Sequence, residues 1–472
     1  MRKTKICCTI GPASADPEII EQLITAGMDV ARLNFSQGSL QTHGKAIKMI
    51  RQASEKLGVP IAIMQDLQGP KIRIGEVENN AIALVRGKEL TITTNKIVGT
   101  SSELFTSYKG LPKDVNVGDR ILLDDGNIQL KVISKQENAV RCRVLVGGPV
   151  ASHKGLNLPG VDVSIPALTN KDKVDLPFGI RNKVDIIAVS FVRRAEDMVQ
   201  VRKIVEKSSH DATVIAKFEK PEAVENLESI LSQSDGTIVA RGDLGVELAL
   251  ERVPPVQRRI VEKCRGQGIP SIIATQMLES MRTNMRPTRA EVSDVANAIY
   301  GGADSVMLTA ETAIGDHPVH TVKTLTRIIK AAEQDLGNIL SLPKLSSKNK
   351  VTTADAVAAS TCHAAYNLKV KAIVTLTQSG YTARMISKYR PLAPIIACTP
   401  NVSVWRQMNL LWGVIPKKMS FAGDIEKIIS RIDEMLRNDK LAKNGDLIVL
   451  VMGLPLPERG TTNLMTIHEV GS

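Results

Sequence analysis

The chain has 472 residues, so we expect several domains rather than one core. Its net charge of +12 is dispersed and aromatic residues make up only 3%, which disfavours a base-stacking nucleic-acid surface and favours small anionic substrates. No run of 18 apolar residues, no export leader and no CxxC pair among the six cysteines is found, which predicts a soluble cytoplasmic protein with reduced thiols.

Strand and helix patterns alternate eight times along the chain. The strand segments are runs of Val, Ile, Leu and Ala without polar alternation, as expected for parallel strands buried on both faces. The pattern predicts a (β/α)8 barrel formed by residues 1–69 and 167–340, with its active site at the C-terminal ends of the strands. The predicted strands are 5–10, 29–35, 61–67, 185–191, 212–218, 236–240, 271–275 and 305–309.

The third strand-helix unit is interrupted by short alternating strands. Residues 70–166 are predicted to form an inserted all-β domain on the catalytic side of the barrel, where it can act as a lid. The expected strands of this insertion are 89–93, 120–123, 129–132 and 140–144. A polar linker at about 337–350 then leads to residues 341–472, whose helix and strand patterns predict an open α/β domain.

The fifth and sixth barrel strands end in charged residues. Lys217 and Glu219 lie on one face of the fifth, and Asp243 follows the sixth. One lysine cannot easily neutralise two desolvated carboxylates, whereas a divalent cation can, and the lysine then suits a phosphate or enolate. The alternative is a buried ion pair without chemistry.

Polar residues also end the second and third strands. Alternation points Arg32, Asn34 and Ser36 to one side, and an arginine at a barrel mouth can clamp phosphate, although a salt bridge at the rim is the alternative. Asp66 can bind a cation. The segment 69–73 contains Lys71 and Arg73, which can neutralise phosphate charge; its Gly-Pro start can equally be a hinge.

Three hydroxyl-bearing turns follow other strands. Thr275 and Thr309 end the seventh and eighth barrel strands, where a threonine is otherwise a common helix cap. In the last domain, the turn 377–382 is rich in hydroxyls and glycine and leads into a helix, an arrangement that can bind phosphate or simply cap the helix. The sequence has no P-loop or dinucleotide-binding glycine motif, so any nucleotide site is of another kind.

Seven segments, taken together and in order, resemble the pyruvate kinase family over essentially the whole chain. They are Arg-Leu-Asn-Phe-Ser (32–36), Gly-Pro-Lys-Ile-Arg (69–73), Ala-Lys-Phe-Glu-Lys (216–220), Ala-Arg-Gly-Asp-Leu-Gly-Val-Glu (240–247), Ala-Thr-Gln-Met-Leu-Glu-Ser-Met (274–281), Arg-Pro-Thr-Arg-Ala-Glu-Val (286–292) and Glu-Thr-Ala (311–313). The resemblance implies transfer of phosphate from phosphoenolpyruvate to ADP, giving ATP and pyruvate, by a Mg²⁺- or Mn²⁺-dependent homotetramer.

The resemblance also implies roles for individual residues. Glu219 and Asp243 would ligate Mg²⁺, Lys217 would stabilise the transferring phosphoryl group and the enolate oxygen, and Thr275 would lie near the enolate carbon. The implied catalytic residues are Lys217, Thr275, Arg73 and Thr309; those binding substrate are Arg32, Lys217, Gly242, Asp243 and Thr275; those binding nucleotide are Arg32, Asn34, Arg73 and Lys171, over which Asp124 and Asp125 would close.

Three positions depart from the usual family pattern. Gln37 replaces a histidine, and Ala310 follows Thr309 where Ser-Gly is commoner. Lys71 replaces a glutamate found in many members, and resembles the branch that does not require K⁺. The family's monovalent-cation pocket corresponds to Asn34, Ser36, Asp66 and Leu67, so we expect the Lys71 ammonium to serve that pocket.

Regulation and assembly are also implied by the resemblance. A phosphorylated small-molecule effector would bind Thr377, Ser379, Gly380 and Thr382, with the loop 460–463 closing over it, and residues 286–291 would contact another subunit. Two alternatives remain open on the sequence alone. One is a different divalent-metal barrel enzyme acting on enolpyruvate or pyruvate, such as a lyase or aldolase, and the other is a nucleic-acid-binding protein that exploits the +12 charge.

Overall fold

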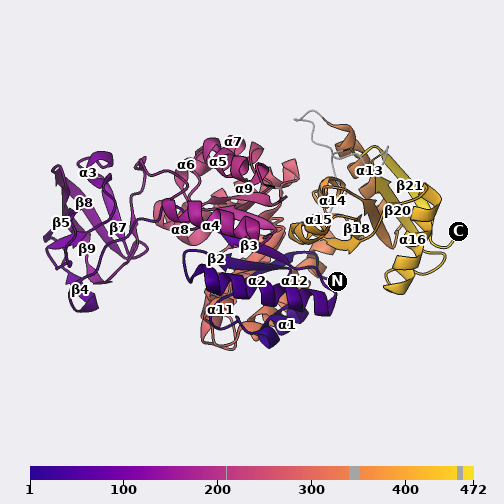
Figure 1. Ribbon diagram of the computed structural model, residues 1–472, viewed down its shortest axis with the longest axis horizontal. Coiled ribbons are helices and arrows are strands. Elements are labelled where there is room, and N and C mark those ends of the chain that lie inside the picture. The colour runs from indigo at the N-terminus through magenta and orange to yellow at the C-terminus, as the bar shows by residue number, and fades with distance from the viewer. Residues whose placement is uncertain (209, 340–350, 454–460) are drawn as a thin grey trace.

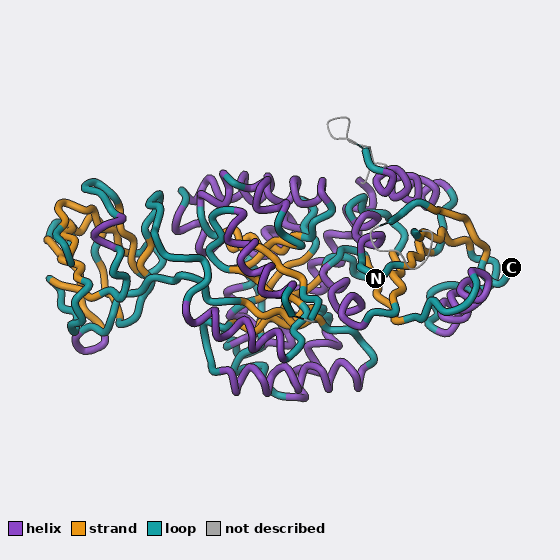
Figure 2. Tube along the Cα trace, turned by 45° about the horizontal axis from the view of Figure 1, so that its top comes forward, coloured by secondary structure: helices purple, strands orange, loops and turns teal. Residues whose placement is uncertain are grey.

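A computed structural model describes residues 1–208, 210–339, 351–453 and 461–472. Three parts follow one another along the long axis: a β-rich part at one end, a barrel in the middle and an α/β part at the other end (Figure 1). The N-terminus lies where the barrel meets the α/β part (Figure 2). Within the described ranges, no helix is both long and apolar enough to cross a membrane.

The middle part is a closed barrel of parallel strands, which confirms the predicted fold class. Around the barrel the strand order is β1-β16-β15-β14-β13-β12-β3-β2. Each predicted barrel strand is found, most of them shortened by a residue at one or both ends. Their bounds are β1 (Lys5–Thr9), β2 (Val30–Asn34), β3 (Ala62–Asp66), β12 (Ile186–Val189), β13 (Thr213–Phe218), β14 (Gly236–Ala240), β15 (Ser271–Ala274) and β16 (Ser305–Leu308).

Helices surround the barrel, and α1, α2, α4 and α10 begin at residues whose side chains cap them. The side chain of Asp16 accepts two backbone N–H bonds at the start of α1, and Gly58 ends α2 in the left-handed conformation. The helices are α1 (Pro17–Ala26), α2 (Leu40–Leu57), α4 (Asn170–Arg181), α5 (Ala195–Glu206), α6 (Pro221–Glu225), α7 (Leu227–Ser232), α8 (Arg241–Glu247), α9 (Val253–Gln267), α10 (Arg289–Tyr300), α11 (Ala310–Ala313) and α12 (Pro318–Ile339).

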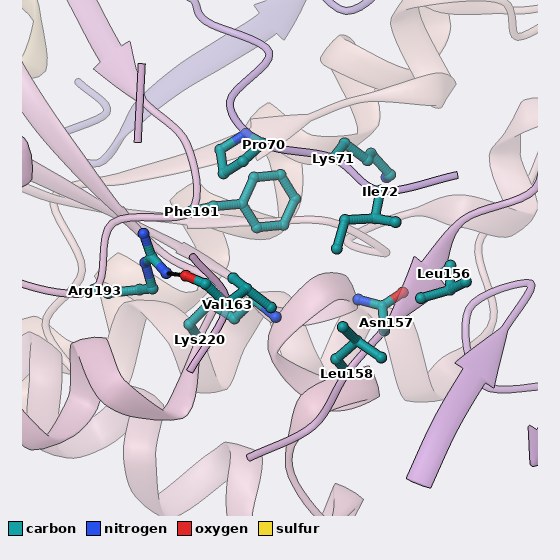
Figure 3. A pocket seen from close by; sticks show the side chains of 10 residues that line it. All are labelled: Pro70, Lys71, Ile72, Leu156, Asn157, Leu158, Val163, Phe191, Arg193 and Lys220. Carbon is teal, nitrogen blue, oxygen red and sulfur yellow. Dashed lines mark hydrogen bonds between the residues drawn. The ribbon is translucent and has the colours of Figure 1, made fainter. Parts of the chain in front are cut away.

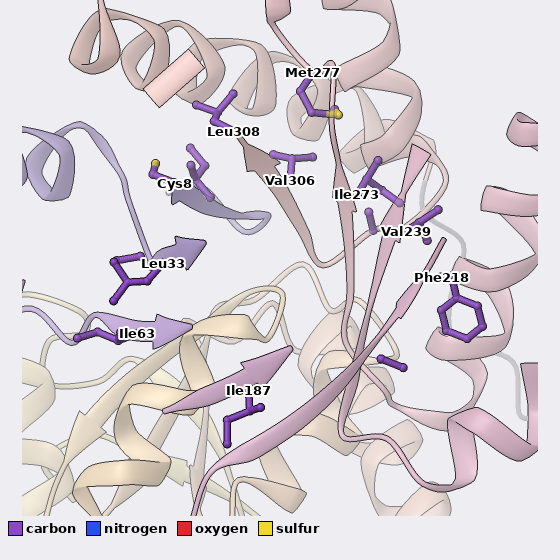
Figure 4. Close-up of a cluster of buried hydrophobic side chains, with 14 of the residues drawn as sticks. Cys8, Leu33, Ile63, Ile187, Phe218, Val239, Ile273, Met277, Val306 and Leu308 are labelled. Carbon is purple, nitrogen blue, oxygen red and sulfur yellow. The ribbon is translucent and has the colours of Figure 1, made fainter. Parts of the chain in front are cut away.

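Two apolar layers hold the barrel together. Side chains that alternate outward, such as Cys8, Ile63 and Val239, pack against the helices (Figure 4). Their inward neighbours, such as Met64 and Ile238, fill the barrel interior. Leu410, from the C-terminal part, joins this interior cluster, so the two parts share a core contact. The barrel is therefore a packed scaffold that can fix the side chains at its rim.

The inserted part lies between β3 and α4 and is mainly antiparallel. One sheet has the order β11-β7-β8-β9-β5-β6 and a smaller one pairs β10 with β4. All four predicted strands of this segment are present. The elements are β4 (Ala81–Leu84), β5 (Glu89–Thr93), β6 (Glu103–Phe105), α3 (Leu111–Asp114), β7 (Arg120–Leu123), β8 (Ile128–Lys135), β9 (Ala139–Val146), β10 (Gly148–Ala151) and β11 (Leu156–Asn157).

The C-terminal part is a five-stranded sheet with helices. Its strand order is β19-β18-β17-β20-β21, with β21 antiparallel to β20. Most of the predicted linker falls outside the described residues, although its first residues belong to α12. The elements are α13 (Thr353–Asn367), β17 (Ala372–Leu376), α14 (Tyr381–Ser387), β18 (Ile395–Thr399), α15 (Val402–Gln407), β19 (Val414–Lys418), α16 (Ile425–Asn438), β20 (Leu447–Met452) and β21 (Leu464–Glu469).

Candidate functional site

Lys217 lies at the centre of a charged cluster at the barrel mouth. Its ammonium is 3.1 Å from Asp66, 2.9 Å from Glu219 and 2.8 Å from the hydroxyl of Ser190. Burial lowers the pKa of Lys217, but the carboxylates of Asp66 and Glu219 more than offset this effect and raise the pKa to about 12. Lys217 is therefore a fixed positive charge at neutral pH and is unsuited to act as a general base.

Arg32 completes the positive side of this cluster. Its Nε donates to Asp66 at 2.6 Å, and Nη1 donates to the Thr9 hydroxyl at 2.9 Å. Burial raises the pKa of Asp66, yet Lys217 and Arg32 outweigh burial and hold that pKa below its usual value. Asp66 thus remains ionised and orients both cations, so that neither needs to reorganise when an anionic substrate arrives.

Glu219 and Asp243 form a site that is suited to a divalent cation. Glu219 is buried, and its second oxygen accepts the Phe191 N–H at 2.7 Å. Burial raises the pKa of Glu219 and the Asp243 carboxylate adds to the rise, although the Lys217 ammonium opposes it. Two neighbouring carboxylates of this kind are stabilised by a hard cation with oxygen ligands.

In the part of the chain that the structure describes, no group of three or more His, Cys, Asp or Glu side chains could hold a metal. A two-carboxylate set matches Mg²⁺, which commonly keeps waters and is bound by one or two carboxylates together with substrate oxygens. The residues present therefore fit this ion.

Lys71 lies beside the carboxylate of Asp243. Its ammonium is 3.7 Å from Asp243, and its side chain is partly exposed. Asn34 accepts the Ser36 N–H at 3.1 Å, and the Leu67 carbonyl accepts the Ser190 hydroxyl at 2.7 Å. That the Lys71 ammonium occupies the monovalent-cation pocket stays a prediction. The ion pair between Lys71 and Asp243 was not predicted from the sequence.

Thr275 and Gly242 meet at the ends of two neighbouring strands. The Thr275 hydroxyl accepts the Gly242 N–H at 2.8 Å and donates to the carbonyl of Ala274 at 2.6 Å. Thr275 has φ of 72°, a left-handed conformation that strains a β-branched residue. Arg241 supports this turn, because its guanidinium donates to the Thr275 carbonyl at 2.6 Å. Such strain is retained where the surrounding structure requires it, often at functional sites.

Thr309 lies at the end of β16 beside a buried acid. Glu311 accepts both the backbone N–H of Thr309 at 2.7 Å and its hydroxyl at 3.2 Å, and its other oxygen accepts the Leu278 N–H at 3.1 Å. These bonds link the last two barrel strands at the rim. Ala310 begins the following short helix, so the turn needs no glycine at that position.

The predicted nucleotide residues are spread over a wider area. Lys171 donates to the Phe35 carbonyl at 2.6 Å and also pairs with Asp175. The exposed Gln37, which replaces a family histidine, has its carbonyl 2.9 Å from the ring of His43. That ring stacks on Phe35 with centroids 4.1 Å apart. A histidine is therefore present close to the position where the sequence pattern lacks one.

The remaining predicted residues belong to the inserted part and its connection. Arg73 donates to the His153 carbonyl at 2.9 Å. Asp124 is 2.7 Å from Lys154, and both Asp124 and Asp125 have positive φ values of 52° and 54°. These two acids occupy the turn between β7 and β8, a strained conformation that presents both side chains at the edge of the sheet.

A cavity separates the inserted part from the barrel (Figure 3). Phe191 and Arg193, which follow β12, form part of one wall, and Ile72 and Leu158 lie across from them. Arg193 donates to the carbonyls of Val163 and Ile165, which attaches the connecting segment to the barrel. The other lining residues are Pro70, Lys71, Leu156, Asn157, Val163 and Lys220.

The predicted effector turn joins β17 to α14. Thr377 is buried, and Gly380 caps α14 with φ of 79°. The Thr382 hydroxyl is 2.9 Å from that of Thr462, so the turn and the late loop meet in the structure. Gly460 of that loop lies outside the described residues. In the segment 286–291, predicted to contact another subunit, Arg286 is exposed and helix α10 begins at Arg289.

Ser190 is a site residue that the strand-end motifs did not identify. Its hydroxyl lies between Lys217, Asp66 and the Leu67 carbonyl, at 2.8, 3.2 and 2.7 Å. Its position at the end of the predicted fourth strand was the available signal, because polar residues at the ends of other barrel strands were already candidates. A serine in that place is otherwise indistinguishable from a helix cap.

Known proteins resemble this chain over nearly its full length. It matches "Pyruvate kinase, barrel domain" at residues 1–322 and "Pyruvate kinase, alpha/beta domain" at residues 355–468. A pyruvate kinase of Geobacillus stearothermophilus is 47% identical over 475 residues (99% of this chain, 80% of that protein), and one of Bacillus licheniformis is 46% identical over 474 residues (100% and 81%). A solved pyruvate kinase from Cryptosporidium parvum superposes with a TM-score of 0.91 at 36% identity (99% and 96%).

Proposed function

The chain belongs to the pyruvate kinase family, and from that premise we propose how its residues transfer the phosphoryl group of phosphoenolpyruvate to ADP. The observation that carries the proposal is the position of Lys217, 2.9–3.1 Å from two carboxylates at the barrel mouth. Phosphoryl transfer needs little covalent chemistry from a protein and depends on positioning and charge neutralisation. The lyase or aldolase alternative is disfavoured by the family, and so is nucleic-acid binding.

Lys217 and Arg32 are the positively charged groups that would neutralise the negative charge of the substrate. We propose that Arg32 clamps the phosphate of phosphoenolpyruvate and that Lys217 faces the bridging oxygen, where enolate charge develops as the P–O bond breaks. Asp66 holds both cations in place before substrate binds. Thr275 and Gly242 would line the side on which the enolate carbon receives its proton.

Glu219 and Asp243 would hold Mg²⁺, or Mn²⁺ in its place. When bound, the ion would neutralise substrate oxygens and orient them. The protein's contribution is to fix the two carboxylates on neighbouring strand ends, Glu219 by its bond from the Phe191 N–H and Asp243 by its helix. The Lys71 ammonium, 3.7 Å from Asp243, adds positive charge on the same side.

The residues proposed to bind ADP are spread over the barrel rim and the insertion. We propose that Lys171, Arg73 and Asn34 contact ADP, that Thr309 supports the rim nearby, and that Asp124 and Asp125 approach when the insertion closes. Closure would exclude water, so that the phosphoryl group passes to ADP rather than being hydrolysed. The proposed lid comprises residues 70–166, between the barrel segments 1–69 and 167–340.

We further propose that activity does not require K⁺, because Lys71 supplies a covalently held positive charge near Asp243. Asn34, Ser36, Asp66 and Leu67 are the pocket residues concerned. The C-terminal domain, residues 341–472, is proposed to bind a phosphorylated effector at Thr377, Ser379, Gly380 and Thr382. We propose a cytoplasmic homotetramer with residues 286–291 at a subunit contact.

A coupled assay tests this function. Purified protein with phosphoenolpyruvate, ADP and Mg²⁺ should form pyruvate and ATP in equal amounts, and omission of ADP should stop pyruvate formation. A lyase or aldolase would instead produce or consume pyruvate without forming ATP. Pyruvate release that does not depend on ADP would overturn the assignment.

A further inference from the structure

A buried ion pair joins the two chain segments that carry the proposed metal carboxylates. The ammonium of Lys220 is 2.5 Å from Oε1 of Glu247, with side chains that are 11% and 1% exposed. The amide of Asn157, from strand β11 of the insertion, donates to the same oxygen at 2.9 Å. Lys220 and Asn157 line the cavity between the barrel and the insertion (Figure 3). Two donors from separate parts of the chain therefore converge on one carboxylate oxygen of a third.

The sequence positions of these residues tie them to the metal site. Lys220 immediately follows Glu219, at the end of β13. Glu247 ends helix α8, one turn after Asp243, and residues four apart lie on the same face of a helix. The Lys220–Glu247 bond thus anchors the strand end that carries one metal carboxylate to the helix that carries the other. Asn157 anchors the insertion to the same point.

Stability alone does not account for this arrangement. The second oxygen of Glu247 is buried and has no hydrogen-bond partner among the described residues. Desolvating a carboxylate and an ammonium costs about as much as their attraction returns, and an unpaired buried acceptor adds to the cost. This unfavourable arrangement is explained if it fixes the positions of Glu219 and Asp243 relative to each other.

We propose that Glu247, held by Lys220 and Asn157, is a positioning residue that couples the orientation of the insertion to the spacing of Glu219 and Asp243. This inference rests on the proposed function, since it takes those two carboxylates as the metal ligands. In this role Asn157 and Glu247 act through the two carboxylates and are not themselves ligands of the ion. Loss of either bond should nevertheless weaken metal binding, because the two carboxylates then need to be ordered by the ion itself.

The coupling can be tested without measuring activity. Electron paramagnetic resonance of free Mn²⁺ gives the affinity of the substrate-free protein for Mn²⁺. Glu247→Gln and Asn157→Ala should each weaken Mn²⁺ binding, by about tenfold for Glu247→Gln, in the range seen when supporting groups of metal ligands are removed. Lys220→Arg, which keeps a charged donor, should bind Mn²⁺ more tightly than Lys220→Met. Matched controls are Glu262→Gln, in an exposed ion pair, and Asn138→Ala, on the exposed surface of the insertion.

A further variant separates this inference from the proposed function. Asp243→Asn should weaken Mn²⁺ binding more than any of these changes. If Asp243→Asn does so while Asn157→Ala and Glu247→Gln bind like the wild type, the positioning role is overturned and the metal site stands. If Asp243→Asn also binds like the wild type, the metal site itself is wrong. Should Glu247→Gln fail to fold, the Asn157→Ala and Asn138→Ala pair decides the question alone.

Discussion

The barrel mouth and the proposed effector turn both follow parallel strands, yet their residues would bind an anion in different ways. At the mouth, Lys217 and Arg32 are already held by the Asp66 carboxylate in a site that is largely buried. The turn at 377–382 offers hydroxyls and a glycine cap, and its recorded side-chain bond is between the neutral hydroxyls of Thr382 and Thr462. The barrel mouth holds fixed charges before a ligand arrives, whereas residues 377–382 of the turn carry none.

This difference indicates what each site can do. Preorganised charge stabilises a transition state because no reorganisation is needed at the moment of reaction. A turn without charge gains affinity from the bonds that it forms with a ligand, and a ligand shifts an equilibrium between two conformations only if it binds them with different affinities. Changes at the mouth should therefore alter turnover, and changes at the turn should alter regulation.

The largest effect is expected from Lys217→Met. Turnover should fall by at least ~10², since a preorganised charged group is lost, while the KM for phosphoenolpyruvate should change less because the stabilised charge develops in the transition state. Steady-state kinetics measure both quantities. Lys56→Met, in an exposed ion pair with Glu21, is the control and should behave like the wild type. Weakened substrate binding with turnover preserved would contradict the role of Lys217.

Asp243→Asn should have the next largest effect. The concentration of Mg²⁺ needed for half-maximal activity should rise by at least about tenfold, because a ligand of the ion loses its charge. Thermal unfolding should show that the variant remains folded, since the Asp243 side chain is partly exposed. Titrating Mg²⁺ at fixed substrate concentration gives the answer. An unchanged Mg²⁺ dependence would remove Asp243 from the metal site.

At the effector turn, Ser379→Asp should abolish activation by phosphorylated metabolites while sparing basal activity. Its carboxylate would occupy the place of the effector phosphate and repel it. Coupling between two sites is typically about 5- to 150-fold in affinity, so its loss is measurable in a panel of sugar phosphates and nucleoside monophosphates. Ser379→Asn, of similar shape but neutral, is the control. A response to effector that survives Ser379→Asp would place the site elsewhere.

The smallest effect is expected at Lys71. Wild-type activity should not require K⁺, whereas Lys71→Glu should be less active without K⁺, by up to about fivefold on the energies of partly exposed ion pairs, and partly restored by KCl. The added carboxylate would face Asp243 and need a cation. Lys71→Met, neutral, serves as the control, with KCl titrated at constant ionic strength. A wild-type enzyme that is inactive without K⁺ would refute this idea.

Much of the barrel was predictable because its strands are short apolar runs. Parallel strands that are buried on both faces have apolar residues at successive positions. Helix α4 was not predicted, since it is polar and contains Pro177. Charged residues at strand ends were found because the C-terminal ends of parallel strands meet at one rim. The contact of Lys71 with Asp243, and the convergence of Lys220 and Asn157 on Glu247, depend on distances across the insertion that periodicity does not encode.

The most direct test follows the phosphoryl group itself. Phosphorus-31 NMR of the wild-type protein with phosphoenolpyruvate, ADP and Mg²⁺ should show the phosphoenolpyruvate signal replaced by the γ-phosphate of ATP, with little inorganic phosphate. With the Lys217→Met variant, phosphoenolpyruvate should be converted at least ~10²-fold more slowly. Phosphate released to water, or phosphoenolpyruvate left intact by the wild-type protein, would contradict the account of the barrel mouth as a phosphoryl-transfer site.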